Sequence, residues 1–379
     1  MKTIFQIDSG TIFGGGQRII LTLIEAFLSS ANMILVAPEG VLVRICKEKF
    51  PQLPILILPK GGAIKKILAL RRFIRVYTPD IIHLHGTRAA FWGRLALIGI
   101  NKRKPIVIYT LHGFHLIRRK QPLKLLLLIA ERFLNKFTDI LVCVSNTDKK
   151  LVLKHRIIAA NKITIIYNGT KIPEHINSRV YSQVVSLKKK FGISPQDIVL
   201  LYIGRLDVPK DIETIIKAIK ILIFQKRYKN VRLIIVGEGP HKKSLVKSSA
   251  QLQDYIFFVG FQQEVIPFLI ISNVLVLSSE WEGLPLALLE AGAFKKPIIG
   301  SNVDGIKEII RDGYNGYLFE FKNPVDLANK IEKFLQNPHL LNQLGNNNFQ
   351  LVKSRFSLER MLDQYKSLYF TYDKNSSSK

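Results

Sequence analysis

The sequence predicts an α/β protein that contains two doubly wound, Rossmann-like domains. Its 379 residues are more than one hydrophobic core usually supports, so two domains are expected. Short β-branched runs alternate with amphipathic stretches from one end of the chain to the other. Nearly continuous apolar strands separated by helices are typical of parallel sheets covered on both faces, and two such series follow one another here.

The expected strands are short apolar runs, which is the pattern of buried parallel strands. The first series consists of Thr3–Asp8, Met33–Ala37, Ile55–Leu58, Ile81–Leu84, Ile106–Leu111, Ile140–Val144 and Ile163–Tyr167. The second series consists of Ile198–Ile203, Arg232–Val236, Ile256–Val259, Val274–Leu277 and Pro297–Gly300.

The boundary between the domains is expected near Asn168, where the segment NGTKIPEHINS carries turn-forming residues and shows no periodicity. Beyond the second series, a helical stretch over Leu358–Tyr369 is expected to cross back to the N-terminal domain. These features predict an N-terminal domain over residues 1–170, a linker over 171–186, a C-terminal domain over 187–355, and a helix with a polar tail over 356–379.

No segment has the character of a signal peptide or a membrane-spanning helix. Asp8 interrupts the short apolar stretch at the amino terminus, and the most lipid-like run, Leu125–Ala130, is far shorter than the roughly 20 apolar residues that a spanning helix needs. The two cysteines, Cys46 and Cys143, lie in apolar runs and are expected to be buried free thiols in a reducing compartment. We therefore expect a cytoplasmic protein that is not integral to a membrane.

Positive charge is the outstanding feature of the composition. The chain has 56 lysines and arginines against 28 acidic residues, which gives a formal net charge of +28. Residues 1–170 carry 27 of these basic residues against 8 acidic ones, and the remainder carries 29 against 20. The first half of the chain is therefore expected to face an anionic partner.

Four basic clusters lie on or beside expected amphipathic helices, interleaved with leucine, isoleucine and phenylalanine. This pattern suits an anionic membrane surface, where apolar side chains enter the interface and basic ones meet the head groups. Ordinary solvated helix faces are the alternative. We expect peripheral association with the inner face of the membrane. The clusters are Lys65-Lys66, Arg71-Arg72-Arg75, Lys102-Arg103-Lys104 and Arg118-Arg119-Lys120-Lys124.

The segment EWEGLPLALLEAGAFKKPIIG is the most informative in the chain. Gly283, Leu284 and Pro285 are expected to form a turn that opens an apolar helix, whose first N–H groups favour an anion. Glu282 would lie just before that helix end, and Glu290 about two turns inside it. Carboxylates accept strong hydrogen bonds from pairs of sugar hydroxyls. Each glutamate alone would suit a helix cap or a solvated surface, but the whole pattern favours a binding site.

Two further segments place polar groups at the carboxyl ends of strands. In LLYIGRLDVPKDIETIIKAI, Gly204 and Arg205 end a strand, and Lys210 precedes a helix that begins near residue 211. Basic side chains beside helix amino ends suit a pyrophosphate, although a lone basic pair is usually solvated. In LIIVGEGPHKKSL, a turn that begins at Gly237 would allow close approach of a nucleotide, and a plain tight turn is the alternative.

From Gly204 to about Glu320 the chain resembles the donor domain of family-four glycosyltransferases, which have the GT-B architecture. In that family the motifs GR(L)…K, VG(D/E)GP and Glu-x7-Glu recur in this order and spacing, and SNVDGIKEIIRDGYNGYLF resembles the family's segment after the glutamate motif. One departure is Asp304, where the family commonly has a small residue, and it leaves the donor-sugar contacts around residues 302–306 open.

The resemblance implies a role for each matching residue. Arg205 and Lys210 would bind the diphosphate. Glu290 would bind the ribose hydroxyls, and Glu282 would lie near the transferred sugar. The family retains the anomeric configuration and needs no divalent metal, and this chain contains no Asp-x-Asp motif. The C-terminal domain would thus bind the nucleotide sugar, and the N-terminal domain would bind the acceptor.

The glycine-rich segment GGGQR follows the first expected strand and resembles the family's GG(A)ER loop, with Gln17 in place of the usual acid. Gly15 and Gly16 would let backbone N–H groups approach a phosphate or sugar of the donor. Arg18 would lie on the acceptor side.

Three histidines end neighbouring strands of the first series. His83 and His85 have the spacing of a metal pair, but no further ligand cluster completes a site, so a structural or acceptor-lining role is expected. His112 matches a family histidine that contacts the donor sugar and helps position the reaction. An ordinary hydrogen-bonded loop histidine is the alternative interpretation.

The resemblance therefore implies a retaining glycosyltransferase without cofactors. It would move a hexose or N-acetylhexosamine from a nucleoside-diphosphate sugar, with UDP favoured over GDP, to a lipid-linked or saccharide acceptor in cell-surface polysaccharide or glycolipid synthesis. Basic side chains and helix amides would stabilise the departing diphosphate. Inverting chemistry with a general base stays open.

Three other functions are alternatives. A UDP-sugar epimerase of the same architecture would need no acceptor. A basic nucleic-acid-binding protein would need a helix-turn-helix, zinc module or aromatic platform, and none is apparent. A non-catalytic subunit is disfavoured because both basic and both acidic donor-side residues are retained.

Overall fold

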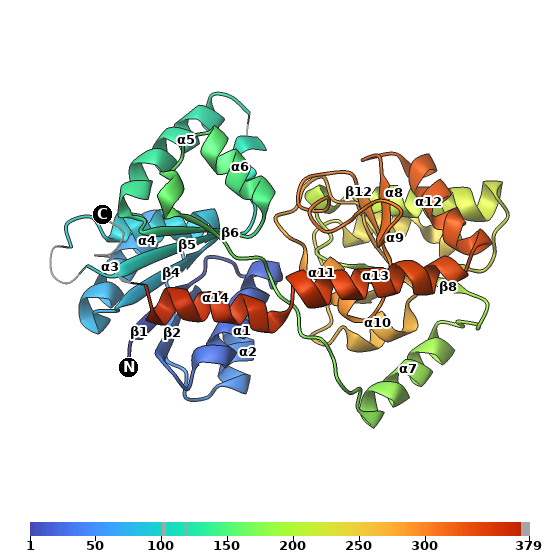
Figure 1. Cartoon of the computed structure of the whole chain (residues 1–379), viewed down its shortest axis with the longest axis horizontal. Coiled ribbons are helices and arrows are strands. Elements are labelled where there is room, and N and C mark those ends of the chain that lie inside the picture. The colour runs from blue at the N-terminus through green and yellow to red at the C-terminus, as the bar shows by residue number, and fades with distance from the viewer. Residues whose placement is uncertain (101–103, 119, 373–379) are drawn as a thin grey trace. The chain divides into compact units, whose positions relative to one another are not determined.

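The computed structural model describes residues 1–100, 104–118 and 120–372. The chain divides into two compact units, each with its own parallel sheet (Figure 1). The first unit comprises Met1–Asn168 and the chain from Met361 onward, and the second comprises Gly169–Arg360. The first unit is therefore built from two separate stretches of the sequence.

The sheet of the first unit has seven strands among the described residues, in the order β3-β2-β1-β4-β5-β6-β7. All seven were expected from the sequence, with ends that differ by at most two residues. The chain builds outward from β1 to β3 and then continues from β4 on the other side, so the switch point lies between β1 and β4. The strands are β1 (Thr3–Ile7), β2 (Asn32–Pro38), β3 (Ile55–Leu58), β4 (Ile81–His85), β5 (Ile106–Leu111), β6 (Ile140–Cys143) and β7 (Ile163–Ile165).

The sheet of the second unit has six strands among the described residues, in the order β10-β9-β8-β11-β12-β13. Five were expected, and the sixth, Gly316–Phe319, was missed because it is short and begins with glycine. A Cβ at Gly316 would lie 2.0 Å from the carbonyl oxygen of Ile298, so only glycine allows this strand pairing. The strands are β8 (Ile198–Ile203), β9 (Val231–Val236), β10 (Ile256–Gly260), β11 (Val274–Leu277), β12 (Ile298–Ser301) and β13 (Gly316–Phe319).

Helices connect the strands and cover the sheets (Figure 1). In the first unit α3 packs against α4, and α4 against α5; in the second, α8 packs against α12 and α11 against α13. The bounds are α1 (Gly15–Phe27), α2 (Val41–Lys49), α3 (Ala63–Tyr77), α4 (Gly86–Ala96), α5 (Leu123–Leu134), α6 (Asn146–Lys154), α7 (Ser178–Lys190), α8 (Ile212–Lys220), α9 (Lys242–Ser248), α10 (Ile266–Ile271), α11 (Leu286–Ala293), α12 (Pro324–Gln336), α13 (His339–Arg355) and α14 (Leu358–Phe370).

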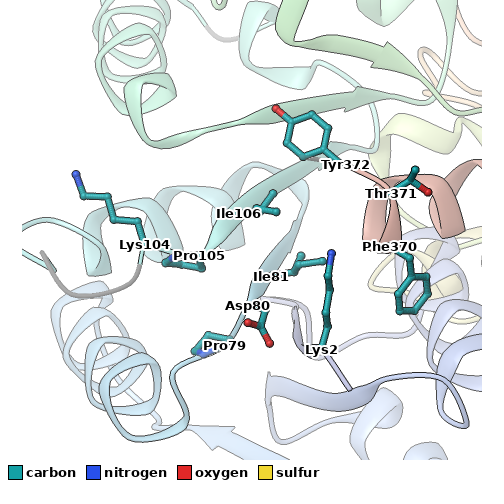
Figure 2. A pocket seen from close by; sticks show the side chains of 10 residues that line it. All are labelled: Lys2, Pro79, Asp80, Ile81, Lys104, Pro105, Ile106, Phe370, Thr371 and Tyr372. Atoms are coloured by element: carbon teal, nitrogen blue, oxygen red, sulfur yellow. The ribbon is translucent and has the colours of Figure 1, made fainter. Parts of the chain in front are cut away.

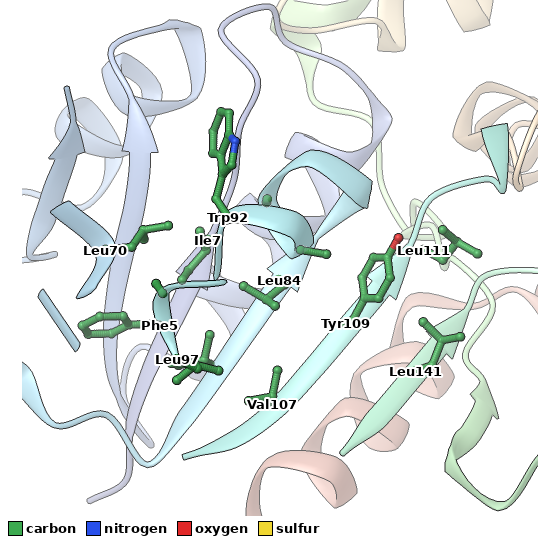
Figure 3. Close-up of a cluster of buried hydrophobic side chains, with 14 of the residues drawn as sticks. Phe5, Ile7, Leu70, Leu84, Trp92, Leu97, Val107, Tyr109, Leu111 and Leu141 are labelled. Atoms are coloured by element: carbon green, nitrogen blue, oxygen red, sulfur yellow. The ribbon is translucent and has the colours of Figure 1, made fainter. Parts of the chain in front are cut away.

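The two faces of the first sheet differ in polarity. Figure 3 shows the apolar side, where Leu84 and Tyr109 on neighbouring strands belong to the same buried cluster as Leu70 of α3 and Trp92 of α4. Alternate residues of a strand point to opposite faces, so the other face receives the polar side chains from β1, β4 and β5. These are Gln6, His83, His85 and Thr110, and hydrogen bonds join them to each other or to α14.

The expected linker over 171–186 is wrong in its second half, because residues 178–186 belong to α7. The side chain of Asn177 caps this helix by accepting a hydrogen bond from the Val180 amide at 3.0 Å. Only Val184 of the helix is buried, so the sequence lacks the apolar stripe that would have revealed it.

Both cysteines are buried free thiols, as the sequence predicted. Burial raises the pKa of Cys46 to about 11 and that of Cys143 to about 12. Neither thiol is therefore ionised or nucleophilic near neutral pH.

Candidate active site

The candidate donor site lies at the switch point of the second sheet, between β8 and β11. β8 continues to β9 on one side and β11 to β12 on the other, so the loops after β8 and β11 lead away from each other at the carboxyl edge. Open α/β sheets bind ligands at such switch points. These two loops carry Arg205, Lys210 and Glu282.

Lys210 and Glu282 meet at this point although they are 72 residues apart. The Lys210 ammonium donates to Glu282 Oε1 at 2.5 Å, and the Ser279 hydroxyl donates to the same oxygen at 2.7 Å. The two side chains are only 18% and 12% exposed. Ser279 is a site residue that the sequence analysis missed, since a serine after a strand carries no distinctive signal.

Backbone contacts fix the two loops to each other. The Glu280 amide donates to the Pro209 carbonyl at 2.8 Å, and the Ser278 hydroxyl donates to the Lys210 carbonyl at 2.8 Å. The position of the Lys210–Glu282 pair is therefore set by the loops and not by the pair alone.

Arg205 lies two residues after the end of β8 and has a half-exposed side chain. Its Nη2 lies 3.0 Å from Asp207 Oδ2, a partner that the sequence analysis did not identify. An ion pair this exposed contributes little to stability, so the guanidinium can exchange its partner for a ligand phosphate at small cost.

Gly204 and Gly237 directly follow the neighbouring strands β8 and β9 and touch through their backbones. Gly237 has a φ of +145°, and a Cβ at this position would lie 1.8 Å from the Gly204 carbonyl oxygen. The Leu206 amide also donates to the Glu238 carbonyl at 3.0 Å. Gly237 is thus needed for contact with the protein's own backbone, whatever its role toward a nucleotide.

Helix α11 begins at Leu286, directly after the turn that contains the buried residues Gly283 and Leu284, and Pro285 is its N-cap. Glu290 is therefore about one turn inside the helix, not two as expected, because the helix starts four residues after Glu282. Its side chain is half-buried.

Asp304, where the sequence departs from the family pattern, lies beside Glu282. The Glu282 amide donates to the Asp304 carbonyl at 3.3 Å, and a Cβ at Gly305 would lie 2.3 Å from the Glu282 carbonyl oxygen. The Asp304 side chain itself is 42% exposed and pairs with Lys307 at 3.8 Å. The contact with Glu282 is made by backbone, which any residue at position 304 provides.

In the first unit, the glycine-rich loop after β1 meets His112 after β5. Gly14 is the N-cap of α1, and a Cβ at Gly16 would lie 3.2 Å from His112 Cδ2, so glycine leaves room for the imidazole. Gly15 is exposed, and Arg18 is half-buried in the first turn of the helix.

Gln17, which replaces the family's usual acid, donates from Nε2 to Asp8 Oδ2 at 2.6 Å and to the Gly10 carbonyl at 2.7 Å. Asp8 is buried, and burial raises the pKa of its carboxyl group while the hydrogen bond from Gln17 lowers it. An amide suits this place because it donates to the aspartate, whereas a second carboxylate would repel it.

His83 and His85 are buried, and burial lowers the pKa of both well below 6.5, so both are neutral. His83 contacts the Tyr369 and Thr110 hydroxyls, each at 2.7 Å. Of the two roles expected, structural or acceptor-lining, the burial of His83 fits the structural one, because its side chain has no exposed surface. Within the described residues, no group of three or more histidine, cysteine or acidic side chains is arranged to hold a metal ion.

A pocket of about 470 Å³ opens at the amino ends of β4 and β5, at the other end of these strands from His85 and His112 (Figure 2). It contains none of the expected site residues. Its lining residues are Lys2, Pro79, Asp80, Ile81, Lys104, Pro105, Ile106, Phe370, Thr371 and Tyr372.

Helices α3 and α5, on either side of α4, carry exposed apolar and basic side chains. We call this the α3–α5 surface. Leu126, Ile129 and Phe133 of α5 are between 51% and 61% exposed. The expected basic residues Lys102, Arg103 and Arg119 lie outside the described residues. The surface comprises Ile64, Lys65, Leu68, Arg72, Arg75, Leu126, Ile129, Arg132, Phe133 and Lys136.

Comparison with known proteins identifies the family. A model described as Glycosyltransferase Family 4 matches residues 13–172, and one described as Glycosyl transferases group 1 matches residues 185–351. N-acetyl-alpha-D-glucosaminyl L-malate synthase of Bacillus anthracis is 30% identical over 297 residues, which are 77% of this chain and 74% of that relative. The chain belongs to the group 1, family-four glycosyltransferases.

Other similar proteins agree with this assignment. UDP-Gal:alpha-D-GlcNAc-diphosphoundecaprenol alpha-1,3-galactosyltransferase of Escherichia coli is 28% identical over 81% of this chain and 79% of its own length. The crystal structure of HepE from Anabaena in complex with UDP-glucose superposes with a TM-score of 0.83 at 17% identity, over 98% of this chain and all of that one. The expected GT-B fold is confirmed, and the protein is a glycosyltransferase. Among the described residues of this glycosyltransferase, no helix has the length and apolar character to span a membrane.

Proposed function

We propose that this glycosyltransferase transfers a hexose or N-acetylhexosamine, with retention, from a UDP-sugar to a lipid-linked or saccharide acceptor in cell-surface polysaccharide or glycolipid synthesis. The names of its relatives support this class of reaction. The Escherichia coli relative is named for UDP-galactose and a diphosphoundecaprenol-linked acceptor, and a Staphylococcus aureus relative for capsular polysaccharide biosynthesis. HepE was crystallised with UDP-glucose.

The observation that carries the proposal is the Lys210–Glu282 pair at the switch point. A half-buried ammonium held by one carboxylate can transfer its hydrogen bonds to a diphosphate, which has more negative charge. Glu282, relieved of the lysine, would then accept hydrogen bonds from hydroxyls of the donor sugar. Arg205, with its half-exposed guanidinium, would be the second cation on the diphosphate.

In this mechanism Lys210, Arg205 and the amides at the start of α11 stabilise the charge that develops on the leaving UDP. The acceptor hydroxyl attacks from the face that UDP leaves, so the anomeric configuration is retained. We propose that the protein's own cations take the role of a divalent metal. Transferase activity that survives excess EDTA would support this metal-independent mechanism. Activity that is lost in EDTA and restored only by Mg²⁺ or Mn²⁺ would contradict it.

Lys210→Met is the sharpest test of the donor site. We expect UDP to bind this variant about ten- to a hundredfold more weakly, because a charge-assisted hydrogen bond is lost. Thermal shift over a UDP, GDP and ADP titration measures this. Lys226→Met is the matched control, since Lys226 forms another half-buried pair, with Glu332, in the same unit. If the two variants bound UDP with equal affinity, Lys210 would not be a UDP-binding residue.

Turnover tests the two glutamates and the stereochemistry. Replacing Glu282 or Glu290 with alanine should abolish most transfer from a UDP-sugar, and unchanged turnover in either variant would refute the assignment. Proton NMR of the product formed from an α-linked donor should show an α-linkage. UDP and an altered hexose released without any acceptor would instead indicate an epimerase.

We further propose that the α3–α5 surface binds an anionic lipid bilayer, which would bring a lipid-linked acceptor to the enzyme. Exposed leucine, isoleucine and phenylalanine beside basic residues match such a surface, and residues 1–170 carry most of the excess positive charge.

Co-sedimentation with phosphatidylglycerol vesicles tests the membrane proposal. Binding should be strong at low salt, weaker at high salt and absent with phosphatidylcholine. The double variant Leu126→Ser/Ile129→Ser should bind less, while Tyr181→Ser/Val185→Ser, which changes exposed apolar residues of α7, should bind normally. Absence of binding at either salt concentration would end this proposal.

A further inference from the structure

A chain of hydrogen bonds runs from His112 to the C-terminal helix α14 within the first unit. It passes through side chains of β1, β4 and β5, and all its members except His112 are buried. The contacts in order are His112 Nε2 to His85 Nδ1 (3.3 Å), His85 Nε2 to Gln6 Oε1 (2.7 Å), Gln6 Nε2 to Tyr369 Oη (2.8 Å), Tyr369 Oη to His83 Nδ1 (2.7 Å), His83 Nε2 to Thr110 Oγ1 (2.7 Å) and Thr110 Oγ1 to Tyr365 Oη (3.3 Å).

The amide of Gln6 gives this chain a direction. Its oxygen can only accept, so His85 Nε2 must carry a proton. His85 is neutral because burial lowers its pKa, so its Nδ1 has the lone pair. His112 Nε2, which lies 3.3 Å from that lone pair, must therefore be the donor.

The remaining hydrogen bonds have the same direction. Gln6 Nε2 donates to the Tyr369 hydroxyl, so the hydroxyl proton of Tyr369 is directed at His83 Nδ1. His83 then donates from Nε2 to Thr110. Because every group donates to the next, the bonds polarise in one sense and strengthen each other.

Packing restrains His112 and Tyr369, two members of this chain of hydrogen bonds. The His85 and His112 rings are stacked with an interplanar angle of 15°, and a Cβ at Gly16 would lie 3.2 Å from His112 Cδ2 and 3.4 Å from its Nε2. Tyr369 packs edge-on against Phe27 of α1 at 5.3 Å. Neither the His112 ring nor the Tyr369 ring can turn away without breaking these contacts.

We propose that Tyr369 of α14 is a positioning residue that acts through Gln6 and His85 to hold His112 as the tautomer protonated at Nε2. This inference rests on the proposed glycosyltransferase function and on the role in positioning the reaction that the family resemblance implies for His112. When this ring is neutral, its lone pair is then on Nδ1. Without the Tyr369 hydroxyl, the Gln6 amide loses the acceptor that orients it, and the rotated amide would present its NH₂ group to His85. His85 would then turn from acceptor to donor at Nδ1, and His112 would be protonated at Nδ1 instead.

The test is the tautomer of His112 in the full-length protein labelled with ¹⁵N-histidine. Long-range ¹H–¹⁵N correlation spectra distinguish the two tautomers, and His112→Gln identifies the signals by their absence. We expect Nε2 to be protonated in the wild type. In Tyr369→Phe, which keeps the ring, we expect a mixture of tautomers and a kcat about fivefold lower, with the donor KM unchanged.

Tyr365→Phe is the matched control, because Tyr365 is an equally buried tyrosine of α14 and the last member of the hydrogen-bond chain that begins at His112. It should keep the Nε2-protonated tautomer. A wild-type His112 protonated at Nδ1, or an unchanged tautomer in Tyr369→Phe, would overturn the proposal. Equal changes in both tyrosine variants would also overturn it, since they would show a general loosening of α14.

A second variant covers the case in which Tyr369→Phe does not fold. Gln6→Met removes the relay amide but leaves α14 intact, and it should also release the tautomer of His112. The spectra need no substrate, so a failure of this inference is distinguishable from a failure of the proposed transferase reaction, which would appear as absent turnover with the wild-type tautomer intact.

Discussion

Gly237 holds two donor-side loops together because it lacks a side chain. Its φ of +145° already disfavours other residues, and the Gly204 carbonyl oxygen occupies the place of a Cβ. Gly313 also has a positive φ, +75°, but nothing lies within 4 Å of its Cβ position. Comparing substitutions at the two glycines therefore distinguishes the effect of backbone strain from the effect of steric overlap.

Gly237→Ala should therefore destabilise the protein by about 3 kcal/mol or more and abolish UDP binding, because the loops after β8 and β9 must separate. Gly313→Ala should cost only about 1 to 2 kcal/mol of strain and leave UDP binding intact. Urea unfolding and UDP thermal shifts measure both effects. Similar losses in the two variants would show that strain, and not the close backbone contact, is what matters.

Asp8 imposes a pH dependence on the first unit. Burial raises its pKa above the ordinary 3.8, so the folded protein holds this proton more tightly than the unfolded chain. The stability that results is complete below pH 3.8 and is lost as pH rises through the folded-state pKa.

Asp8→Asn should remove this loss, since asparagine does not ionise and its amide oxygen can still accept from Gln17. The stability of the variant relative to wild type should increase as pH rises from about 4 towards neutrality. Urea unfolding across that range gives the difference. A constant difference would mean that the Asp8 pKa is not raised.

At the scale of elements, α5 is anchored by a buried ion pair. Arg94 of α4 donates from Nη2 to both carboxylate oxygens of Glu131 at 2.9 Å, and from Nη1 to Asn135 at 3.0 Å. Burial is the main influence on the Glu131 carboxyl and raises its pKa, while Arg94 lowers it. Much of the other face of α5 is exposed, so this pair is a principal attachment of the helix.

Glu131→Ala should therefore cost about 3 to 5 kcal/mol, because it leaves the Arg94 guanidinium buried without its carboxylate. Glu39→Ala, which breaks an exposed pair with Lys47, should cost less than about 1 kcal/mol. Chemical denaturation compares the two. A small effect at Glu131 would mean that water or Asn135 compensates for the lost charge.

At the scale of the whole molecule, the chain leaves the first unit at Asn168 and returns to it at Met361. The returning helix α14 supplies Tyr365 and Tyr369 to the buried polar face of the first sheet. The first unit is therefore complete only after the entire second unit has been synthesised.

If the second unit binds the nucleotide, UDP should slow backbone hydrogen exchange most in residues 204–211, 237–241 and 278–290. These segments follow β8, β9 and β11 at the carboxyl edge of one sheet. Exchange measured by mass spectrometry with and without UDP gives the pattern. Strongest protection in the first unit would contradict the proposed donor site.

Much of the fold was predictable because buried parallel strands are local features of a sequence. Every expected strand exists, since each is an apolar run that must pair to satisfy its backbone. Gly316–Phe319 and α7 were missed because their placement depends on partners, Ile298 and α10, that lie far away in the sequence.

The sequence by itself determined the two-sheet architecture and, through its motifs, the family and the candidate donor residues. Only the tertiary structure decided which of these side chains meet. It joined Lys210 to Glu282 and Ser279, placed His83 inside the protein, and connected His112 to Tyr369 through buried hydrogen bonds. The physical reason is that apolar periodicity records burial locally, whereas hydrogen-bond partners are chosen by parallel strands and a returning helix that bring together residues hundreds of positions apart.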